Sequence, residues 1–368
     1  MFDAIAVSPA WRGRTRAWVS FDKSDVRSLL AGERVYFAHG PTNRNIPNLL
    51  RNLVFAWRVL GETHPRVVVT TGAGIGVPFA WVGRLRCARI IYIECAGRVD
   101  HPSLSARLIS PVASRLYAQW PELAVSWRRA RYAGNVLLGQ LDRANPPASS
   151  GTGVLVTVGT NEAPFDRLLR AVPSLTDEQV VVQHGPSAVR PEGAQCFDYL
   201  PFGELGRLID AARVVVTHAG DGSVAAALAH GRRPIVMPRL SQFGEAVDDH
   251  QVPFARQLEG AGLATVVEDG DRLLQVVANQ PQAPAPLSGH EPDLSLEIAH
   301  AIAELLTHGS RVRTTVPAWA YDCRTTSLTD RLGAARNAVK SGRPPFRTRF
   351  LRWSHGRGSS WGTRPRGL

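Results

Sequence analysis

The sequence predicts an α/β protein with two halves, each built on a parallel sheet, on the strength of three observations. Short uncharged runs rich in valine, such as Val67–Thr71 and Val214–Val216, are typical of strands buried on both faces. Glycine-containing turns and then helical patterns follow these runs, which is the order of a parallel βαβ unit. Residues 141–153 are rich in Pro, Ser and Gly and predict a linker between the halves.

We therefore divide the chain into a first domain at 1–140, the linker at 141–153, a second domain at 154–307 and a tail at 308–368. The tail lacks apolar periodicity, which predicts disorder. From Arg311 onward it holds thirteen Lys or Arg against two Asp, which leaves 30 basic and 29 acidic residues elsewhere. Of the net charge of +12, +11 thus resides in the tail, and a nucleic-acid partner, which we do not expect, would depend on the tail alone.

In the first domain we expect strands at Arg16–Phe21 and Val35–Ala38, followed by a helix with an apolar stripe. The stripe consists of Ile46, Leu49, Leu50, Leu53, Val54, Trp57 and Leu60. We favour a helix whose stripe faces the core. The alternative is an interfacial helix that rests on anionic lipid through its tryptophan and nearby arginines.

Two features of the first domain are candidates for ligand contact. Gly72 and Gly74 follow a strand and let the backbone approach a ligand, although helix–strand packing explains them equally well. Glu94 ends the next apolar run, at the sheet edge where open α/β folds bind ligands. A pair with Arg98 or Arg107 is the alternative to a role of Glu94 in ligand binding or proton transfer.

The second domain contains the strongest candidate site, between Val214 and Gln251. A glycine turn at 218–223 precedes a helix at Val224–His230, whose free N–H groups and positive dipole suit a phosphate. After the next strand, Pro234–Met237, a polar loop reaches Gln251, and we expect helix from Glu245 to Glu259. Asp269-Gly270-Asp271 reads as a turn and helix cap rather than a metal site. Leu294–Leu306 is an amphipathic helix expected to pack on the first domain.

The stretch from Val214 to Gln251 resembles the signature of the glycosyltransferase family 28 C-terminal domain. Residues 154–166 are similar to the family's opening Val-Thr-Val-Gly-Thr…Phe-Asp, and residues 183–185 to its Gln-x-Gly turn. The resemblance implies a nucleotide-sugar site. The donor-binding residues that it and the local chemistry indicate are Gly159, Thr160, Gln183, His218, Gly220, Gly222, Ser223, Asp248, Asp249, His250 and Gln251. His218 either faces the diphosphate or is a strand-end histidine with its bonds satisfied by the protein.

The first domain resembles the membrane-recruiting subunit of the dolichol-cycle N-acetylglucosaminyltransferase. The resemblance rests on Ile91-Tyr92-Ile93-Glu94, on Arg98, Ser103 and Arg107, and on Gln119-Trp120. It implies acceptor binding by Gly72, Gly74, Arg98 and Arg107, with Glu94 as the catalytic candidate.

Together the resemblances imply the GT-B architecture, in which two Rossmann-like domains with parallel sheets face a cleft. They imply transfer of N-acetylglucosamine or a related hexose from a UDP-sugar to a polyprenyl-diphosphate-linked acceptor, as in bacterial exopolysaccharide-type transferases. The expected partners are the UDP-sugar, the lipid-linked acceptor, the inner membrane surface and a partner subunit. We expect no cofactor and no metal. Scattered cysteines and the lack of a secretory signal favour the cytoplasm, with peripheral binding at the cytoplasmic face of the plasma membrane.

Two departures from the family pattern leave other functions open. The family's acidic residue on the helix after the glycine turn falls at Ala226, and nothing before Arg12 matches the family's Gly-Gly-His loop, whose histidine is a candidate base. A UDP-sugar-binding homologue without catalysis and a UDP-sugar 2-epimerase are therefore the alternatives.

Overall fold

The structure, a computed structural model, describes residues 15–42, 45–141, 151–172, 179–280 and 293–307. These residues belong to one compact unit, Met1–Val312. The predicted tail and most of the predicted linker lie outside the described residues, and the domain boundaries stay a prediction. We refer to residues 15–141 as the N-terminal half and to 151–280 as the C-terminal half.

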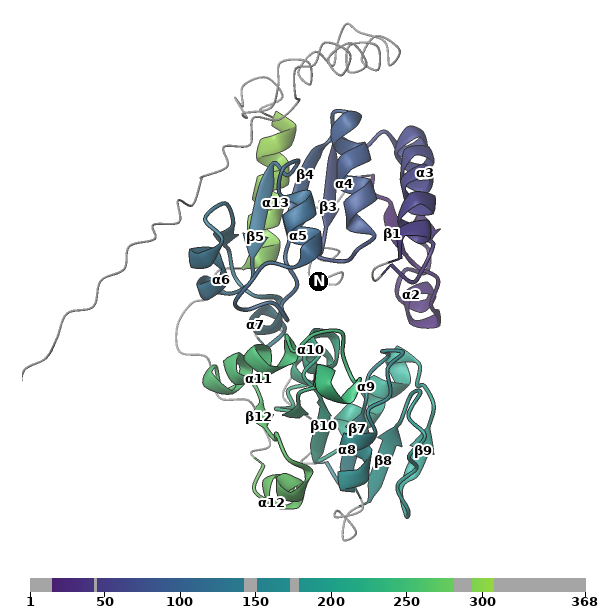
Figure 1. Ribbon diagram of the computed structural model, residues 1–368, viewed down its shortest axis with the longest axis vertical. Helices are drawn as coiled ribbons and strands as arrows, with labels where there is room; N and C mark the ends of the chain where they lie inside the picture. The colour runs from purple at the N-terminus through teal and green to yellow at the C-terminus, as the bar shows by residue number, and fades with distance from the viewer. Residues whose placement is uncertain (1–14, 43–44, 142–150, 173–178, 281–292, 308–368) are drawn as a thin grey trace, which may run out of the picture. The chain divides into compact units, whose positions relative to one another are not determined.

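The N-terminal half has a two-stranded and a four-stranded sheet, both parallel (Figure 1). The small sheet pairs β1 (Trp18–Phe21) with β2 (Val35–Ala38), and α2 (Ser24–Leu29) connects them. The larger sheet has the order β3 (Val67–Thr70), β4 (Arg89–Ile93), β5 (Arg115–Ala118), β6 (Arg131–Tyr132). The other helices of this half are α3 (Ile46–Thr63), α4 (Gly76–Leu85), α5 (Leu104–Ile109), α6 (Pro121–Ser126) and α7 (Val136–Leu141).

The C-terminal half has one six-stranded parallel sheet of order β12-β11-β10-β7-β8-β9. Its strands are β7 (Val154–Thr157), β8 (Val180–Gln183), β9 (Gln195–Phe197), β10 (Val214–His218), β11 (Ile235–Met237) and β12 (Thr265–Val266). Its helices are α8 (Asp166–Ala171), α9 (Phe202–Ala211), α10 (Asp221–Ala229), α11 (Gln251–Gly260) and α12 (Leu273–Ala278), with short 3₁₀ turns η3 (Ser241–Phe243) and η4 (Gly270–Arg272). The expected parallel α/β class is confirmed in both halves.

The apolar cores explain why the strands of the C-terminal half contain no Asp, Glu, Lys or Arg. Val154, Val156, Val214 and Val216 are buried in one cluster under α8 and α12. A second cluster combines Leu137 and other residues of the N-terminal half with residues of α10 and α11. Burying a side chain of this size stabilises the fold by about 1.5–3 kcal/mol.

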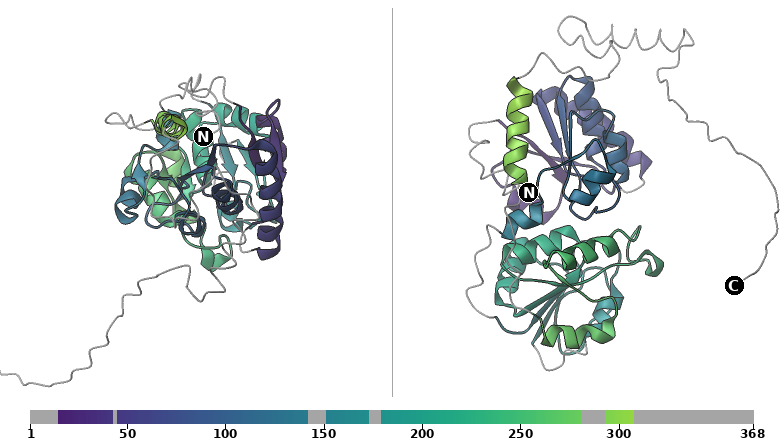
Figure 2. Two further views of the ribbon diagram at one scale, coloured as in Figure 1. Left: turned by 90° about the horizontal axis from the view of Figure 1, so that it is seen from above. Right: turned by 90° about the vertical axis from the view of Figure 1, so that its left-hand side faces the viewer.

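Helix α13 (Leu294–Thr307) packs against the sheet of the N-terminal half, as expected (Figure 2). Its apolar residues Ile298 and Ile302 lie in one buried cluster with Ile91 and Ile93 of β4. The Tyr117 hydroxyl donates to Glu297 Oε1 at 3.2 Å. The helix therefore returns the end of the described chain to its first half.

Two local predictions were wrong. The helix after β11 begins at Gln251 rather than Glu245, because the acidic side chains before it bind loop backbone instead. Glu245 Oε2 accepts from the Leu240 N–H at 2.9 Å, and Asp249 Oδ1 accepts from the Ser241 N–H at 2.6 Å.

The core-facing interpretation of the α3 stripe was also wrong. Ile46 is 68% exposed and Val54 is 73% exposed, and of the stripe only Leu60 is buried. The buried face carries Asn48 and Asn52 instead. Asn52 accepts from the His39 N–H at 2.9 Å and donates to the His39 carbonyl at 2.8 Å, so it secures the loop after β2 to the helix. Within the described residues, α3 and every other helix fall short of the length and apolar character that crossing a membrane requires.

Candidate functional site

The carboxyl ends of β7, β8, β10 and β11 bring most of the predicted donor-site residues to one edge of the sheet. Gly159 and Thr160 follow β7, and His218 ends β10. Gln183 ends β8, where it is buried and accepts from the Thr157 hydroxyl at 2.6 Å. Thr160, by contrast, is exposed. The parallel register predicted this convergence, because the carboxyl ends of parallel strands meet at one edge.

The imidazole of His218 is enclosed between two of the predicted glycines. A Cβ at Gly159 or at Gly220 would overlap the ring, and Gly159 has a φ of +74°. Both glycines therefore make room for a histidine of the protein itself. Close approach to a ligand, for which they were singled out, remains a prediction.

Each nitrogen of His218 has a partner within the protein. Nε2 lies 3.2 Å from Ser223 Oγ, and Nδ1 lies 3.4 Å from Gln251 Nε2. Burial, reinforced by the positive charge of Arg239, lowers the pKa of His218 to about 3. His218 is thus a neutral strand-end histidine, and contact with a diphosphate stays a prediction.

The N-terminus of α10 is the part of the site best suited to an anion. Gly220 is its N-cap residue without a side-chain cap, and Gly222 and Ser223 lie in its first turn. A Cβ at Gly222 would meet open space. The carboxylate of Asp221 would compete with an anionic ligand for the N–H groups at this end. It accepts from the Gly222 N–H at 2.9 Å and from the Cys95 thiol at 3.1 Å.

Ala226 points into the protein rather than into the site. It is 8% exposed and packs in an apolar cluster with Leu155, Ile209 and Val215. A carboxylate in this cluster would be buried without a partner, which is strongly unfavourable. The apolar packing around residue 226 therefore accounts for an alanine at this position.

The polar loop before α11 divides into exposed and buried groups. Asp248 Oδ2 accepts from Arg98 at 3.0 Å, and Asp248 Oδ1 pairs with His250 Nδ1. Burial would raise the pKa of Asp248, but the bonds from His250 and Arg98 outweigh it and lower the pKa to about 2. Asp249 binds loop backbone, and Gln251 is buried. Asp248 and His250 are the half-exposed pair of this loop.

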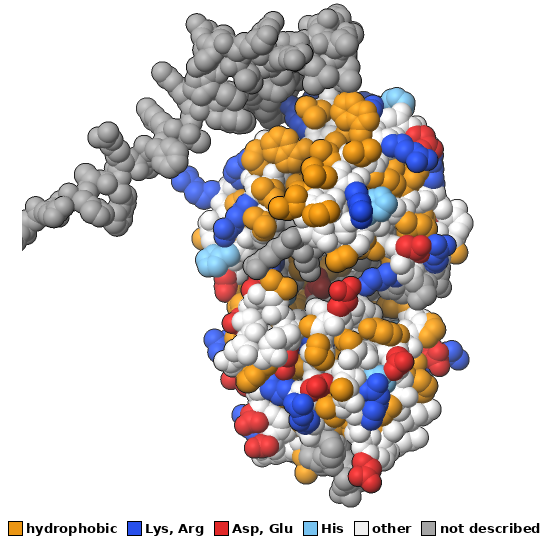
Figure 3. All heavy atoms as spheres, turned by 45° about the vertical axis from the view of Figure 1, so that its right-hand side comes forward, with side chains coloured by type: hydrophobic (Ala, Val, Ile, Leu, Met, Phe, Trp, Pro, Cys, Tyr) orange, Lys and Arg blue, Asp and Glu red, His pale blue; other side chains and the backbone are white. Residues whose placement is uncertain are grey.

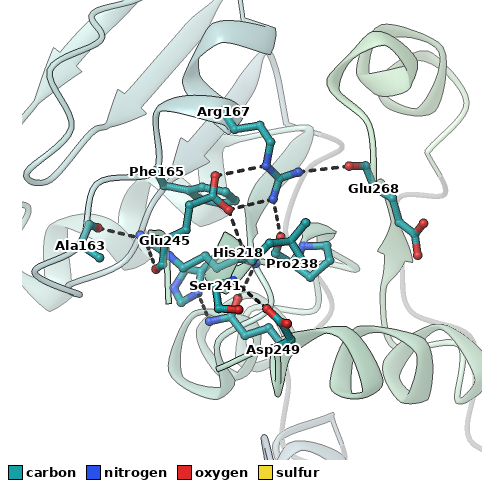
Figure 4. Close-up of polar contacts among 12 residues, drawn as sticks. Ala163, Phe165, Arg167, His218, Pro238, Ser241, Glu245, Asp249 and Glu268 are labelled. Carbon is teal, nitrogen blue, oxygen red and sulfur yellow. Dashed lines mark hydrogen bonds and ion pairs between the residues drawn. The ribbon is translucent and has the colours of Figure 1, made fainter. Parts of the chain in front are cut away.

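Three residues that sequence reasoning missed connect the loops of the site (Figure 4). The buried guanidinium of Arg239 donates to the carbonyls of Val158, Ala163, Pro164 and Glu245 at 2.8 to 3.1 Å. Arg167 forms two bonds with the Glu245 carboxylate and donates to the Pro238 carbonyl at 2.6 Å. The loop after β7 and the loop after β11 are thereby held together. The sequence signal that could have identified Arg239 is its position directly after a buried strand and a proline.

Glu94 is fully buried at the end of β4. Its Oε1 accepts from the Tyr92 hydroxyl and the Cys95 N–H, both at 2.9 Å, and its Oε2 accepts from the Ser103 N–H at 2.8 Å. The alternative pairing with Arg98 or Arg107 is not formed, since Arg98 binds Asp248 and Arg107 is exposed on α5. The geometry favours a role of Glu94 in positioning the loops around it.

The glycines after β3 are explained by packing. Gly72 has a φ of +75°, and a Cβ there would lie 3.2 Å from the Cys95 nitrogen. A Cβ at Gly74 would lie 3.0 Å from Thr42 Oγ1. Acceptor binding by Gly72, Gly74, Arg98 and Arg107 stays a prediction.

The described residues hold no group of three or more His, Cys, Asp or Glu arranged to bind a metal. Asp269 accepts from the Asp271 N–H at 3.2 Å, which is the cap chemistry expected of this turn. Cys95 and Cys196 are free thiols.

Comparisons with known proteins match two separate stretches of the chain. Residues 153–288 match the model of the glycosyltransferase family 28 C-terminal domain, and residues 39–136 match that of the oligosaccharide biosynthesis protein Alg14 like family. The UDP-N-acetylglucosamine transferase subunit ALG14 of Eremothecium gossypii is 41% identical over 79 residues, 20% of this chain and 35% of that protein.

A bacterial relative matches over a longer stretch. It is the UDP-N-acetylglucosamine--N-acetylmuramyl-(pentapeptide) pyrophosphoryl-undecaprenol N-acetylglucosamine transferase of Anaeromyxobacter dehalogenans, 26% identical over 257 residues, 64% of each chain. The chain thus spans between about a third and two thirds of the length of these relatives.

A solved structure supports the fold. The structure of a protein named putative UDP-N-acetylglucosamine 2-epimerase, from Listeria monocytogenes, has a TM-score of 0.56 at 12% identity, covering 81% of this chain and 89% of that one. Together with the parallel sheets, this likeness fits the GT-B architecture. The chain is therefore similar to the Alg14-like family over residues 39–136 and to the glycosyltransferase family 28 C-terminal domain over residues 153–288.

Proposed function

We propose that this protein is a hexosyltransferase that moves N-acetylglucosamine, or a related hexose, from a UDP-sugar to a polyprenyl-diphosphate-linked acceptor. The single observation that carries the proposal is the N-terminus of α10, open at Gly222 and lined by Ser223, inside the family 28 domain match. Backbone N–H groups and the helix dipole there suit the leaving diphosphate without a metal ion.

The transfer also needs a base for the acceptor hydroxyl, and His250 offers one better than Glu94 does. His250 is half-exposed and its Nδ1 pairs with Asp248, which leaves Nε2 as the free proton acceptor. A Cβ on Gly97 would lie 3.9 Å from His250 Cδ2, so the ring lies close to the loop after β4. Glu94, by contrast, is fully buried and holds three hydrogen bonds.

We further propose that the protein works at the cytoplasmic face of the plasma membrane and binds it through α3. The exposed stripe of α3 continues into Trp81 and Leu85 of α4 and Leu104 and Leu108 of α5. Figure 3 shows hydrophobic side chains gathered on this part of the surface with basic side chains nearby. Such a face suits the boundary between headgroups and acyl chains of anionic lipid. A partner subunit is proposed by analogy with the ALG14 relatives, whose names call them subunits.

The proposal is tested by calorimetry of UDP binding to the full chain. We expect micromolar binding that Ser223→Trp abolishes, because an indole would fill the N-terminus of α10. Gly260→Trp, which adds the same indole at an open position at the end of α11, is the matched control and should bind UDP normally. Absence of binding at millimolar UDP would refute the donor site.

A non-catalytic UDP-sugar-binding homologue is the second candidate, and Ala226 is the observation that favours it. Both candidates predict UDP binding, so transfer decides between them. Incubation with UDP-N-acetylglucosamine and a polyprenyl-diphosphate-linked acceptor should yield a glycosylated lipid if the first is right. The 2-epimerase alternative is not favoured, because the relatives by sequence are named as transferases.

A further inference from the structure

Gln251 is held in one orientation by the backbone. It is buried, and its Oε1 accepts from the Arg239 N–H at 3.0 Å. A backbone N–H can only donate, so this bond fixes which end of the amide is the oxygen. The Nε2 amide group must then be the end that lies 3.4 Å from His218 Nδ1.

The tautomer of His218 follows from this orientation. An amide NH₂ group only donates, so Nδ1 of His218 must accept and cannot carry a proton. The neutral ring therefore carries its proton on Nε2. That nitrogen lies 3.2 Å from Ser223 Oγ, and the ring cannot swing away because Gly159 and Gly220 enclose it.

The donor-to-acceptor direction of these hydrogen bonds continues to Ser223. A hydroxyl that accepts from Nε2–H keeps its own proton for another partner. Ser223 lies in the first turn of α10, beside the open side of Gly222. The sequence of bonds from Arg239 through Gln251 and His218 thus ends in a hydroxyl donor at a helix N-terminus.

We propose that Gln251 is a positioning residue that holds His218 as the neutral Nε2–H tautomer and so makes the Ser223 hydroxyl a hydrogen-bond donor to an anion at the N-terminus of α10. The tautomer does not depend on the proposed function. Its consequence for UDP affinity rests on the proposed donor site.

Two substitutions at Gln251 separate the effect of reversing its hydrogen bond to His218 from the effect of removing that bond. In Gln251→Glu one carboxylate oxygen still accepts from the Arg239 N–H, and the other can only accept from His218. The proton then moves to Nδ1, Nε2 becomes an acceptor, and Ser223 must donate to it instead of to the anion. Gln251→Met removes the amide without adding charge, so neither tautomer is imposed. Gln275→Glu, on an exposed position of α12, is the control for the added charge.

The test is ¹⁵N nuclear magnetic resonance of the histidine-labelled full chain near neutral pH without nucleotide, with the His218 signal assigned by its loss in His218→Asn. Wild type and Gln275→Glu should show the Nε2–H form alone. Gln251→Glu should show the Nδ1–H form, and Gln251→Met a mixture of tautomers.

UDP calorimetry then tests the consequence. Ser223→Ala should weaken UDP binding about tenfold, the size expected for one hydrogen bond to a charged group. Gln251→Met should weaken it by a smaller factor, because the fraction of the protein with Nε2–H keeps the donor. In the double variant the two losses should not add, because both remove the same donor. A merely structural role of Gln251 would give additive losses.

Wild-type His218 with its proton on Nδ1, or doubly protonated, would overturn the inference, whatever the Gln251 variants show. Unchanged tautomer in Gln251→Glu would overturn it as well. The expected tautomers in a protein that fails to bind UDP would refute the proposed function and leave the role of Gln251 intact.

Discussion

The residues of the site show that one feature of a sequence can serve a different purpose from the one it suggests. Gly159 and Gly220 are typical of loops that approach a phosphate, yet in the structure they accommodate the ring of His218. His218 in turn is satisfied by Ser223 and Gln251. Glycines and histidine form one packed unit, and any ligand would meet its outer edge.

The buried His218 makes stability depend on pH. Its pKa is about 3 in the folded protein against an ordinary 6.5, so between these values the unfolded state binds the proton and the folded state does not. The free energy of unfolding should therefore fall as the pH drops below 6.5, by about 1.4 kcal/mol per pH unit from this residue.

Urea unfolding of wild type and His218→Asn at several pH values measures this contribution, because the other histidines cancel in the difference. The gap between the two proteins should shrink on acidification. Parallel curves for the two proteins would mean that His218 is not kept neutral by its surroundings.

Helix α3 illustrates the limits of periodicity at the scale of an element. The 3.6-residue spacing of its apolar stripe correctly predicted a helix, Ile46–Thr63. It did not tell which face is buried, because Asn48 and Asn52 bond to the backbone of the preceding loop and take the inner side. An apolar face left outside in this way suits a membrane surface.

Substitutions on this face should weaken membrane binding without affecting the fold. Leu50→Glu with Val54→Glu removes two exposed apolar side chains and adds two negative charges. We expect at least a tenfold loss of partitioning onto vesicles that contain anionic lipid, since each apolar side chain contributes about 1.5 kcal/mol or more. Sedimentation with such vesicles measures it.

Val125→Glu is the matched control, because Val125 is 80% exposed on α6, away from the α3 stripe. It should bind vesicles like wild type. Equal binding by all variants would exclude the α3 face as the membrane contact.

At the scale of the whole molecule, the described chain is closed by a helix that comes last in sequence. Helix α13 covers β4 and β5 of the N-terminal half, and Arg66 donates to the Leu306 carbonyl at 2.6 Å. The sheet that begins near residue 67 is thus completed by residues beyond 293. Folding of the N-terminal half should depend on this distant segment.

Charge placed on the inner face of α13 should destabilise the protein. Ile302→Asp buries a carboxylate against Ile91 and Ile93, so we expect a loss of about 3 kcal/mol or more in the free energy of unfolding. Leu296→Asp lies on the same helix but is 49% exposed, and should change stability by less than about 0.5 kcal/mol. Urea denaturation of both variants compares the two faces; equal losses would show that α13 does not close the sheet.

The sequence by itself determined the parallel α/β class, most strand positions and the sheet edge at which the predicted site residues lie. The short runs of valine match the length of a buried strand, and the glycine turns mark where those strands end. Both signals can be read from neighbouring residues alone. The motif residues of the second half, from Gly159 to Gln251, were identified by their resemblance to the family 28 pattern together with local chemistry, and their role in donor binding stays a prediction.

Only the tertiary structure decided which face of α3 is buried, that Glu94 is enclosed, and that Arg239, Arg167 and Glu245 join the loops of the site. Each depends on hydrogen-bond partners far away in sequence, such as Val158 for Arg239 and Ser103 for Glu94. Local patterns carry no information about such partners, because a buried charge is tolerated only where the folded chain supplies them.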